Sequence, residues 1–139
     1  MRGSWKVVPH TAEVGLELAG PDWPAFYEAA AYGLLELYGA RPKPKGEEAR
    51  SLSLHAEAPE DLLVSWLNEL IYLVATKRWI PLRVRVEKAE ATRLAAELEG
   101  SPMPEGVRLI QEIKAATFGG LAVRGPGKGG PWARVILDV

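Results

Sequence analysis

The sequence predicts an α+β fold: a single domain over residues 1–139, in which two helices pack with mostly antiparallel β-sheets. Three observations support this class. Two segments carry the apolar stripe of a helix with a buried face, roughly seven segments are strand-like, and these strands follow one another mostly in hairpin order. The composition, 47% hydrophobic and 25% charged, is that of an ordinary globular chain long enough to bury a core.

The N-terminal part predicts two strands and a helix. Residues 5–8 form a short apolar run, and residues 14–19 alternate between apolar and small or polar side chains, which is typical of a half-buried strand. Asp22 is suited to cap the start of the following helix, and Gly39 is suited to end it in a left-handed conformation. Residues 41–46, with two prolines and three cations, are predicted to be a solvated loop.

The middle of the chain predicts a strand over residues 50–56 and a second helix that starts at Pro59. This helix is apolar over more than one face, so we expect other elements to pack on several of its sides. Asn68, the only asparagine in the chain, lies within it. Because buried polar groups are usually satisfied, we expect Asn68 to bond a neighbouring strand end or loop.

The C-terminal half predicts further strands separated by turns or loops. They cover residues 83–87, 91–98, 108–118 with a continuation over 121–124, and 132–139, with a loop over 100–106.

Composition excludes several functional classes. The net charge of -1 and pI of about 6.2 argue against a dedicated nucleic-acid binder, which normally has a basic surplus. The absence of cysteine excludes thiolate metal sites and cysteine nucleophiles. No signal-peptide or membrane-spanning run is visible, so we expect a cytoplasmic protein without a membrane partner. With two histidines and no evident nucleophile–base set, hydrolysis is disfavoured.

Two places carry the residues best suited to metal chemistry. Glu13 lies in the polar segment 10–15, where His10 could be a ligand or support one, and hard divalent cations prefer carboxylate and carbonyl oxygens. Asp138 and Val139 end the chain, and their neighbouring carboxylates repel each other unless a cation lies between them. Local sequence alone also fits a solvated glutamate in a loop and a frayed terminus.

Glu112 and Lys114 form a third candidate. On a strand, period-two alternation places them on one face, where they could form a surface ion pair. Alternatively, Lys114 could meet a phosphate group or an acidic partner.

Five segments resemble the archease family in order along almost the whole chain: residues 10–15, 25–26 with the alanine-rich helix that follows, 62–70, 112–117 and 132–139. The resemblance implies a small α+β activator of an RtcB-type RNA ligase in tRNA splicing and RNA repair, which meets RNA only indirectly. Such a protein is not an enzyme itself: it promotes guanylylation of the ligase and its multiple turnover.

The resemblance also implies a divalent cation, calcium in family structures, with magnesium or manganese as alternatives. By position, its ligands are Glu13, Asp138 and Val139, while His10 and Lys114 are candidates for contact with the partner. Two other interpretations stay open: a chaperone or interaction module with a structural metal, and a small metal-dependent hydrolase.

The chain departs from the family pattern in places. Glu13 replaces the usual aspartate of the motif, which keeps the charge but lengthens the side chain. Ser101, Arg108 and Gly119 stand where the family has a glutamate and two histidines, so the polar complement is thinner than usual.

Overall fold

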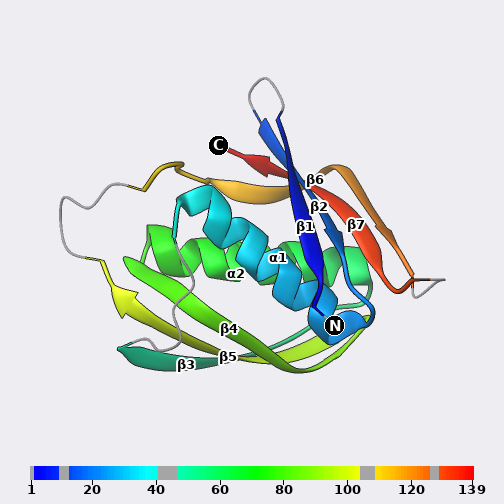
Figure 1. Ribbon diagram of the computed structural model, residues 1–139, viewed down its shortest axis with the longest axis horizontal. Coiled ribbons are helices and arrows are strands. Elements are labelled where there is room, and N and C mark those ends of the chain that lie inside the picture. The colour runs from blue at the N-terminus through cyan, green and yellow to red at the C-terminus, as the bar shows by residue number, and fades with distance from the viewer. Residues whose placement is uncertain (1, 10–12, 41–46, 104–108, 126–128) are drawn as a thin grey trace.

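Two β-sheets enclose the two helices (Figure 1). The computed structural model describes residues 2–9, 13–40, 47–103, 109–125 and 129–139. The helices are α1 (Trp23–Tyr38) and α2 (Pro59–Ala75). The strands are β1 (Ser4–Pro9), β2 (Glu13–Ala19), β3 (Glu48–His55), β4 (Trp79–Glu90), β5 (Arg93–Pro102), β6 (Ala115–Arg124) and β7 (Trp132–Asp138). The predicted loop at residues 41–46 lies outside the described residues.

The strands form a four-stranded sheet of order β1-β2-β7-β6 and a three-stranded sheet of order β3-β5-β4. All described pairings are antiparallel. Helix α1 contacts β1 and β2 on one side and β4 on the other, while α2 contacts β6 as well as β3 and β4. The predicted α+β class, with two helices and mostly antiparallel sheets, is confirmed.

Helix α1 begins and ends where the sequence predicts. The Asp22 side chain accepts a hydrogen bond of 2.9 Å from the backbone N–H of Ala25, which satisfies one free donor of the first turn. At the other end, Gly39 has φ +79, a left-handed conformation that glycine adopts without a side-chain penalty.

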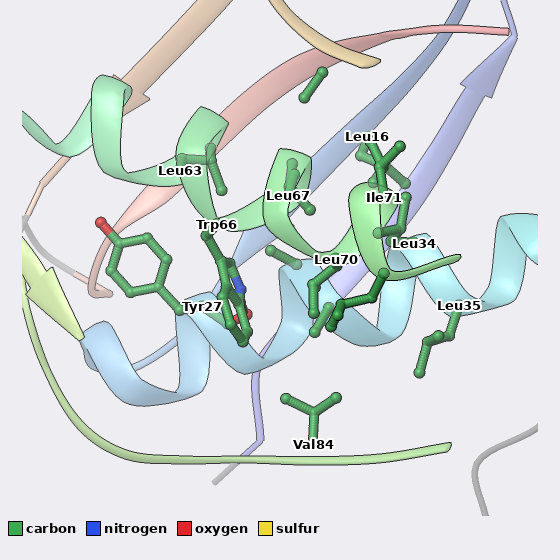
Figure 2. Close-up of a cluster of buried hydrophobic side chains, with 14 of the residues drawn as sticks. Leu16, Tyr27, Leu34, Leu35, Leu63, Trp66, Leu67, Leu70, Ile71 and Val84 are labelled. Carbon is green, nitrogen blue, oxygen red and sulfur yellow. Dashed lines mark hydrogen bonds between the residues drawn. The ribbon is translucent and has the colours of Figure 1, made fainter. Parts of the chain in front are cut away.

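Helix α2 is central, as its apolar sequence predicts. Its side chains meet α1, β2 and β4 in one hydrophobic cluster (Figure 2). Trp66 is fully buried, and its indole N–H donates to the backbone oxygen of Tyr27 at 2.8 Å. This bond joins the two helices and leaves no unpaired polar group on the indole.

Side chains from α1 occupy the free edge of β4. The Tyr32 hydroxyl donates to the backbone oxygen of Val84 and accepts from its N–H, both at 2.9 Å. The Glu28 carboxylate accepts from the N–H of Val86 at 3.1 Å. An edge strand with unpaired groups can pair with another chain, and these bonds remove that opportunity along part of β4.

Asn68 of α2 does the same for β6, the edge strand of the other sheet. Its side-chain oxygen accepts from the N–H of Ala116 at 2.8 Å, and its amide donates to the backbone oxygen of Ala116 at 3.2 Å. The amide thus replaces a neighbouring strand. The prediction that Asn68 bonds a strand is confirmed.

The predicted strand over residues 108–118 is wrong at its start, because β6 begins only at Ala115. Residues 109–114 instead cross the end of α1: the N–H of Ile110 bonds the backbone oxygen of Tyr38, and the side chain of Ile113 is buried. The period-two argument for Glu112 and Lys114 therefore does not apply.

The predicted loop over 100–106 is also wrong in its first part. Strand β5 continues through Pro102, because Ser101 and Pro102 pair with the start of β4. Residues 104–108 lie outside the described part of the chain. Within that part, no helix combines the length and apolarity needed to cross a membrane.

Candidate metal centre

The pairing of β2 with β7 places Glu13 directly opposite Asp138. The two residues are 125 positions apart in the numbering, yet they are partners at the end of one antiparallel ladder. Side chains at directly opposite positions have Cβ atoms about 4.5–5.5 Å apart. Two carboxylates at this separation can bind one ion between them. Glu13 is exposed and Asp138 is half-buried, so the position is open to solvent.

The register that creates this pair is fixed by the opposite face of the sheet. Leu16 pairs with Val135 and Leu18 with Ala133, and all four side chains are fully buried. A shift of one residue would turn these apolar side chains towards solvent. The core therefore specifies where Glu13 and its partner meet.

A third strand fixes the other side of Asp138. Ala115 of β6 pairs with Asp138, and the backbone N–H of Lys114 donates to the Asp138 carbonyl at 2.8 Å. Asn68 holds Ala116, the next residue of β6. No side-chain pattern in the sequence indicates this support, because it consists of backbone contacts.

The two carboxylates lie on the outer face of the sheet, where charge compensation differs from place to place. On this face, Glu17 accepts an ion-paired hydrogen bond from Arg134 at 2.9 Å. Neither Glu13 nor Asp138 has an ion pair with any residue that the structure describes. Like charges directly opposite in a sheet are destabilising, so the pair favours a cation.

The donor set suits a hard cation. Within the described ranges, no group of three or more His, Cys, Asp or Glu side chains could hold a metal. Two carboxylates would therefore act with main-chain oxygens or water, the ligands that Ca²⁺ and Mg²⁺ accept. The side chain of Val139 packs against the core, so this residue could contribute only main-chain or carboxyl oxygens.

The remaining predicted site residues have mixed outcomes. Lys114 is exposed and adjoins Asp138 through its backbone, so the structure brings it to the candidate centre. His10, with Thr11 and Ala12, lies outside the described residues.

Tyr38 lies beneath the segment that leads to Lys114, and no signal in the sequence marks it as a neighbour of the candidate site. Burial raises the pKa of the Tyr38 hydroxyl well above its usual range, and the negative charge of Glu112 adds to the effect. The hydroxyl is buried without a hydrogen-bond partner among the described residues. Tyr38 is thus a neutral packing residue at neutral pH.

Comparison with known proteins identifies the family. The model of the Archease protein family (MTH1598/TM1083) matches residues 5–139. The chain belongs to the archease family. The archease of Thermococcus gammatolerans is 32% identical over 118 residues, which are 82% of this chain and 83% of that protein. The archease of Thermoplasma acidophilum is 26% identical over 136 residues, 98% of this chain and 94% of that one.

Two solved structures show the same archease fold. The solution structure of protein 1598 from Methanobacterium thermoautotrophicum matches with a TM-score of 0.73 at 26% identity, covering 98% of this chain and 99% of that chain. The crystal structure of an archease from Thermotoga maritima, described as a possible chaperone, matches with a TM-score of 0.66 at 27% identity and covers 96% of both chains.

Proposed function

We propose that this archease activates an RtcB-type RNA ligase in tRNA splicing or RNA repair, and that it does so through a divalent cation held by Glu13 and Asp138. One observation carries the proposal: the β2–β7 register sets these two carboxylates opposite each other without a cationic partner among the described residues. Calcium is the first candidate, with magnesium and manganese as alternatives, because all three accept oxygen ligands.

In this proposal, each residue of the candidate centre has a specific role. Glu13 and Asp138 hold the cation, and an oxygen of Val139 completes the protein's share. A bound cation would supply a positive charge that a phosphate or carboxylate of the partner can contact. The β6 backbone keeps Asp138 in place, while the exposed Lys114 is free to contact the partner or its nucleotide.

The proposed role is that of an accessory protein and not of an enzyme. An acidic, cation-bearing end that contacts the ligase near its nucleotide pocket would stabilise the ligase conformation competent for guanylylation. An accessory protein shifts such an equilibrium only if it binds one conformation more tightly than the other. In this role the protein contacts the ligase and does not bind RNA directly.

A reconstituted guanylylation assay tests this function. Purified protein is added to a slow RtcB-type ligase with GTP and metal, and the covalent guanylate is followed together with the number of ligations per ligase. We expect faster guanylylation and multiple turnover with the wild-type chain. Glu13→Gln and Asp138→Asn should abolish the effect, since each removes one ligand charge while preserving shape.

Glu17→Gln is the matched control, because Glu17 lies on the same outer face but is paired with Arg134. It should activate the ligase like the wild type. A wild-type chain that changes neither guanylylation nor turnover would contradict the proposal, as would activation that survives in both acid variants.

A chaperone role is the second candidate. The Thermotoga maritima relative is described as a possible chaperone. Here, Ile110 and Phe118 are large apolar side chains that are 85% and 58% exposed, and exposed apolar side chains can contact unfolded clients. Suppression of aggregation of unrelated proteins by the Glu13→Gln variant would favour this role. A phosphoester hydrolysed by the protein alone would instead favour a hydrolase.

A further inference from the structure

A hollow of about 730 Å³ lies at the turn between β4 and β5, away from the two acids. Its polar lining consists of Ser53, His55, Lys88, Glu90 and Arg93. Apolar groups from Pro24, Leu54, Ala89 and neighbouring residues form the rest of the lining. Ligand-binding sites typically have volumes of about 300–1,000 Å³, apolar walls and a few convergent polar groups.

The register of the three-stranded sheet explains why these polar groups converge. His55 pairs with Arg93, and Arg93 pairs with Glu90, so the three form one row across the strands. Ala95 lies two residues after Arg93 on β5, so the two residues share a face of the sheet. Because Ala95 pairs with Lys88, Lys88 also lies on that face. Lys88 is therefore a diagonal neighbour of Arg93 on the adjacent strand, at a separation of about 7–8 Å that long side chains can span.

A β-bulge brings Lys88 to this face. The pairing shifts between Val86 and Lys88, so that the alternation along β4 changes phase. Val86 is buried in the core. Without the shift, the side chain of Lys88 would point into the core, as that of Val86 does two residues earlier. With the shift, Lys88 points outward, next to the row that contains Arg93. Bulges commonly re-aim side chains in this way.

Charge compensation separates this hollow from the rest of the same face. Farther along, Arg83 pairs with Glu99 at 3.1 Å and Arg85 with Glu87 at 2.9 Å. In the hollow, by contrast, the side chains of His55, Lys88 and Arg93 have no ion pair or hydrogen bond with any residue that the structure describes. Among the described residues of this lining, the two cations Lys88 and Arg93 outnumber the one carboxylate, that of Glu90.

We propose that this hollow binds a compact oligophosphate group, such as that of a nucleoside triphosphate, through Arg93, Lys88, His55 and the Ser53 hydroxyl. An arginine donates a fork of N–H groups to phosphate oxygens, and a lysine adds a point charge. The described residues of the lining include no aromatic side chain on which a base could stack, so the phosphates provide recognition.

The site is independent of the proposed metal centre. Pro24 lies in the first turn of α1, and the chain reaches α1 from the far end of β2, opposite to Glu13. Figure 1 shows the β4–β5 turn near the start of α1, while the C-terminus lies on the opposite side of the helices, towards the top of the view. Failure of ligase activation would therefore leave this proposal intact.

Isothermal titration calorimetry of the full chain tests the proposal, with a chelator present to keep divalent cations out. The probes are tripolyphosphate, ATP and a short single-stranded RNA. We expect tripolyphosphate and ATP to bind the wild type, and Arg93→Gln and Lys88→Gln each to weaken both by about tenfold. Glu90→Gln should tighten binding several-fold, because it removes a charge that repels phosphate.

Arg85→Gln is the matched control, since Arg85 lies on the same face but is paired with Glu87. It should leave both affinities within about twofold of the wild type, and thermal unfolding confirms that every variant is folded. The proposal is overturned if tripolyphosphate does not bind at millimolar concentration, or if Arg85→Gln weakens binding as much as Arg93→Gln. Binding of RNA without binding of tripolyphosphate would also overturn it and would identify a nucleic-acid surface.

Discussion

The outer face of the β2–β7 ladder shows two opposite arrangements of charge on one pair of strands. At one position, Glu17 faces Arg134, and the two side chains form an ion pair of 2.9 Å. Four residues away along β2, Glu13 faces Asp138, and neither has a cationic partner among the described residues. The same backbone geometry therefore supports both a neutralised pair and a repulsive one.

This difference shows that the geometry of the sheet does not require two acids at the position of Glu13 and Asp138. An opposite-charge pair across two strands stabilises by about 0.2–1 kcal/mol, whereas like charges in the same positions destabilise. The protein nevertheless anchors Asp138 from both sides, with β2 on one and β6 on the other. A repulsive pair held in a well-defined frame is what a cation site requires before the ion arrives.

The largest expected effect concerns that frame. Asn68→Ala should lower the free energy of unfolding by about 2–3 kcal/mol, because it leaves the N–H and C=O of Ala116 without their partners. Chemical denaturation measures the change. Ser65→Ala, at an exposed position of the same helix, is the control and should change stability by less than about 0.5 kcal/mol. Equal effects of the two substitutions would show that the Asn68 clamp does not hold β6.

A smaller effect is expected at the neutralised end of the ladder. Arg134→Gln should lower the free energy of unfolding by about 0.2–1 kcal/mol, because the pair with Glu17 is partly exposed and solvent screens it. The loss should shrink as salt is raised. Denaturation at low and high ionic strength tests both statements, and a salt-independent loss would point to side-chain packing rather than charge.

The smallest effect should have the opposite sign. In metal-free buffer at low salt, Glu13→Gln is expected to raise the free energy of unfolding by a few tenths of a kcal/mol, because it relieves repulsion with Asp138. Added calcium should reverse the order of stability, since only the wild type then gains binding energy. A variant that is less stable than the wild type without metal would remove the contrast between the two ends of the ladder.

How much of this could be predicted from the sequence depends on how local each feature is. The start of α1 at Asp22 and its end at Gly39 follow from local rules, and both are confirmed. The start of β6 does not follow from the sequence, because residues 109–114 cross the end of α1, where the N–H of Ile110 bonds the backbone oxygen of Tyr38, a contact that depends on the tertiary fold. No alternation pattern anticipates such a bond.

The candidate site shows the same limit. Local patterns marked Glu13 and Asp138 separately, and only the family resemblance joined them. Their meeting depends on register, which the buried pairs Leu16–Val135 and Leu18–Ala133 determine across the whole length of the chain. The hollow beside Arg93 could not be found from sequence, because its Lys88 reaches that face only through a bulge.

Calorimetric titration of the chelator-treated protein with calcium shows whether Glu13 and Asp138 bind an ion together. We expect one binding event in the wild type, with an affinity unchanged within about twofold in Glu17→Gln and weakened at least about tenfold in both Glu13→Gln and Asp138→Asn. Magnesium and manganese, titrated in parallel, establish which cation is preferred. If none of the three binds the wild type, or if the two acid variants bind as tightly as the wild type, the acidic pair is not a metal centre.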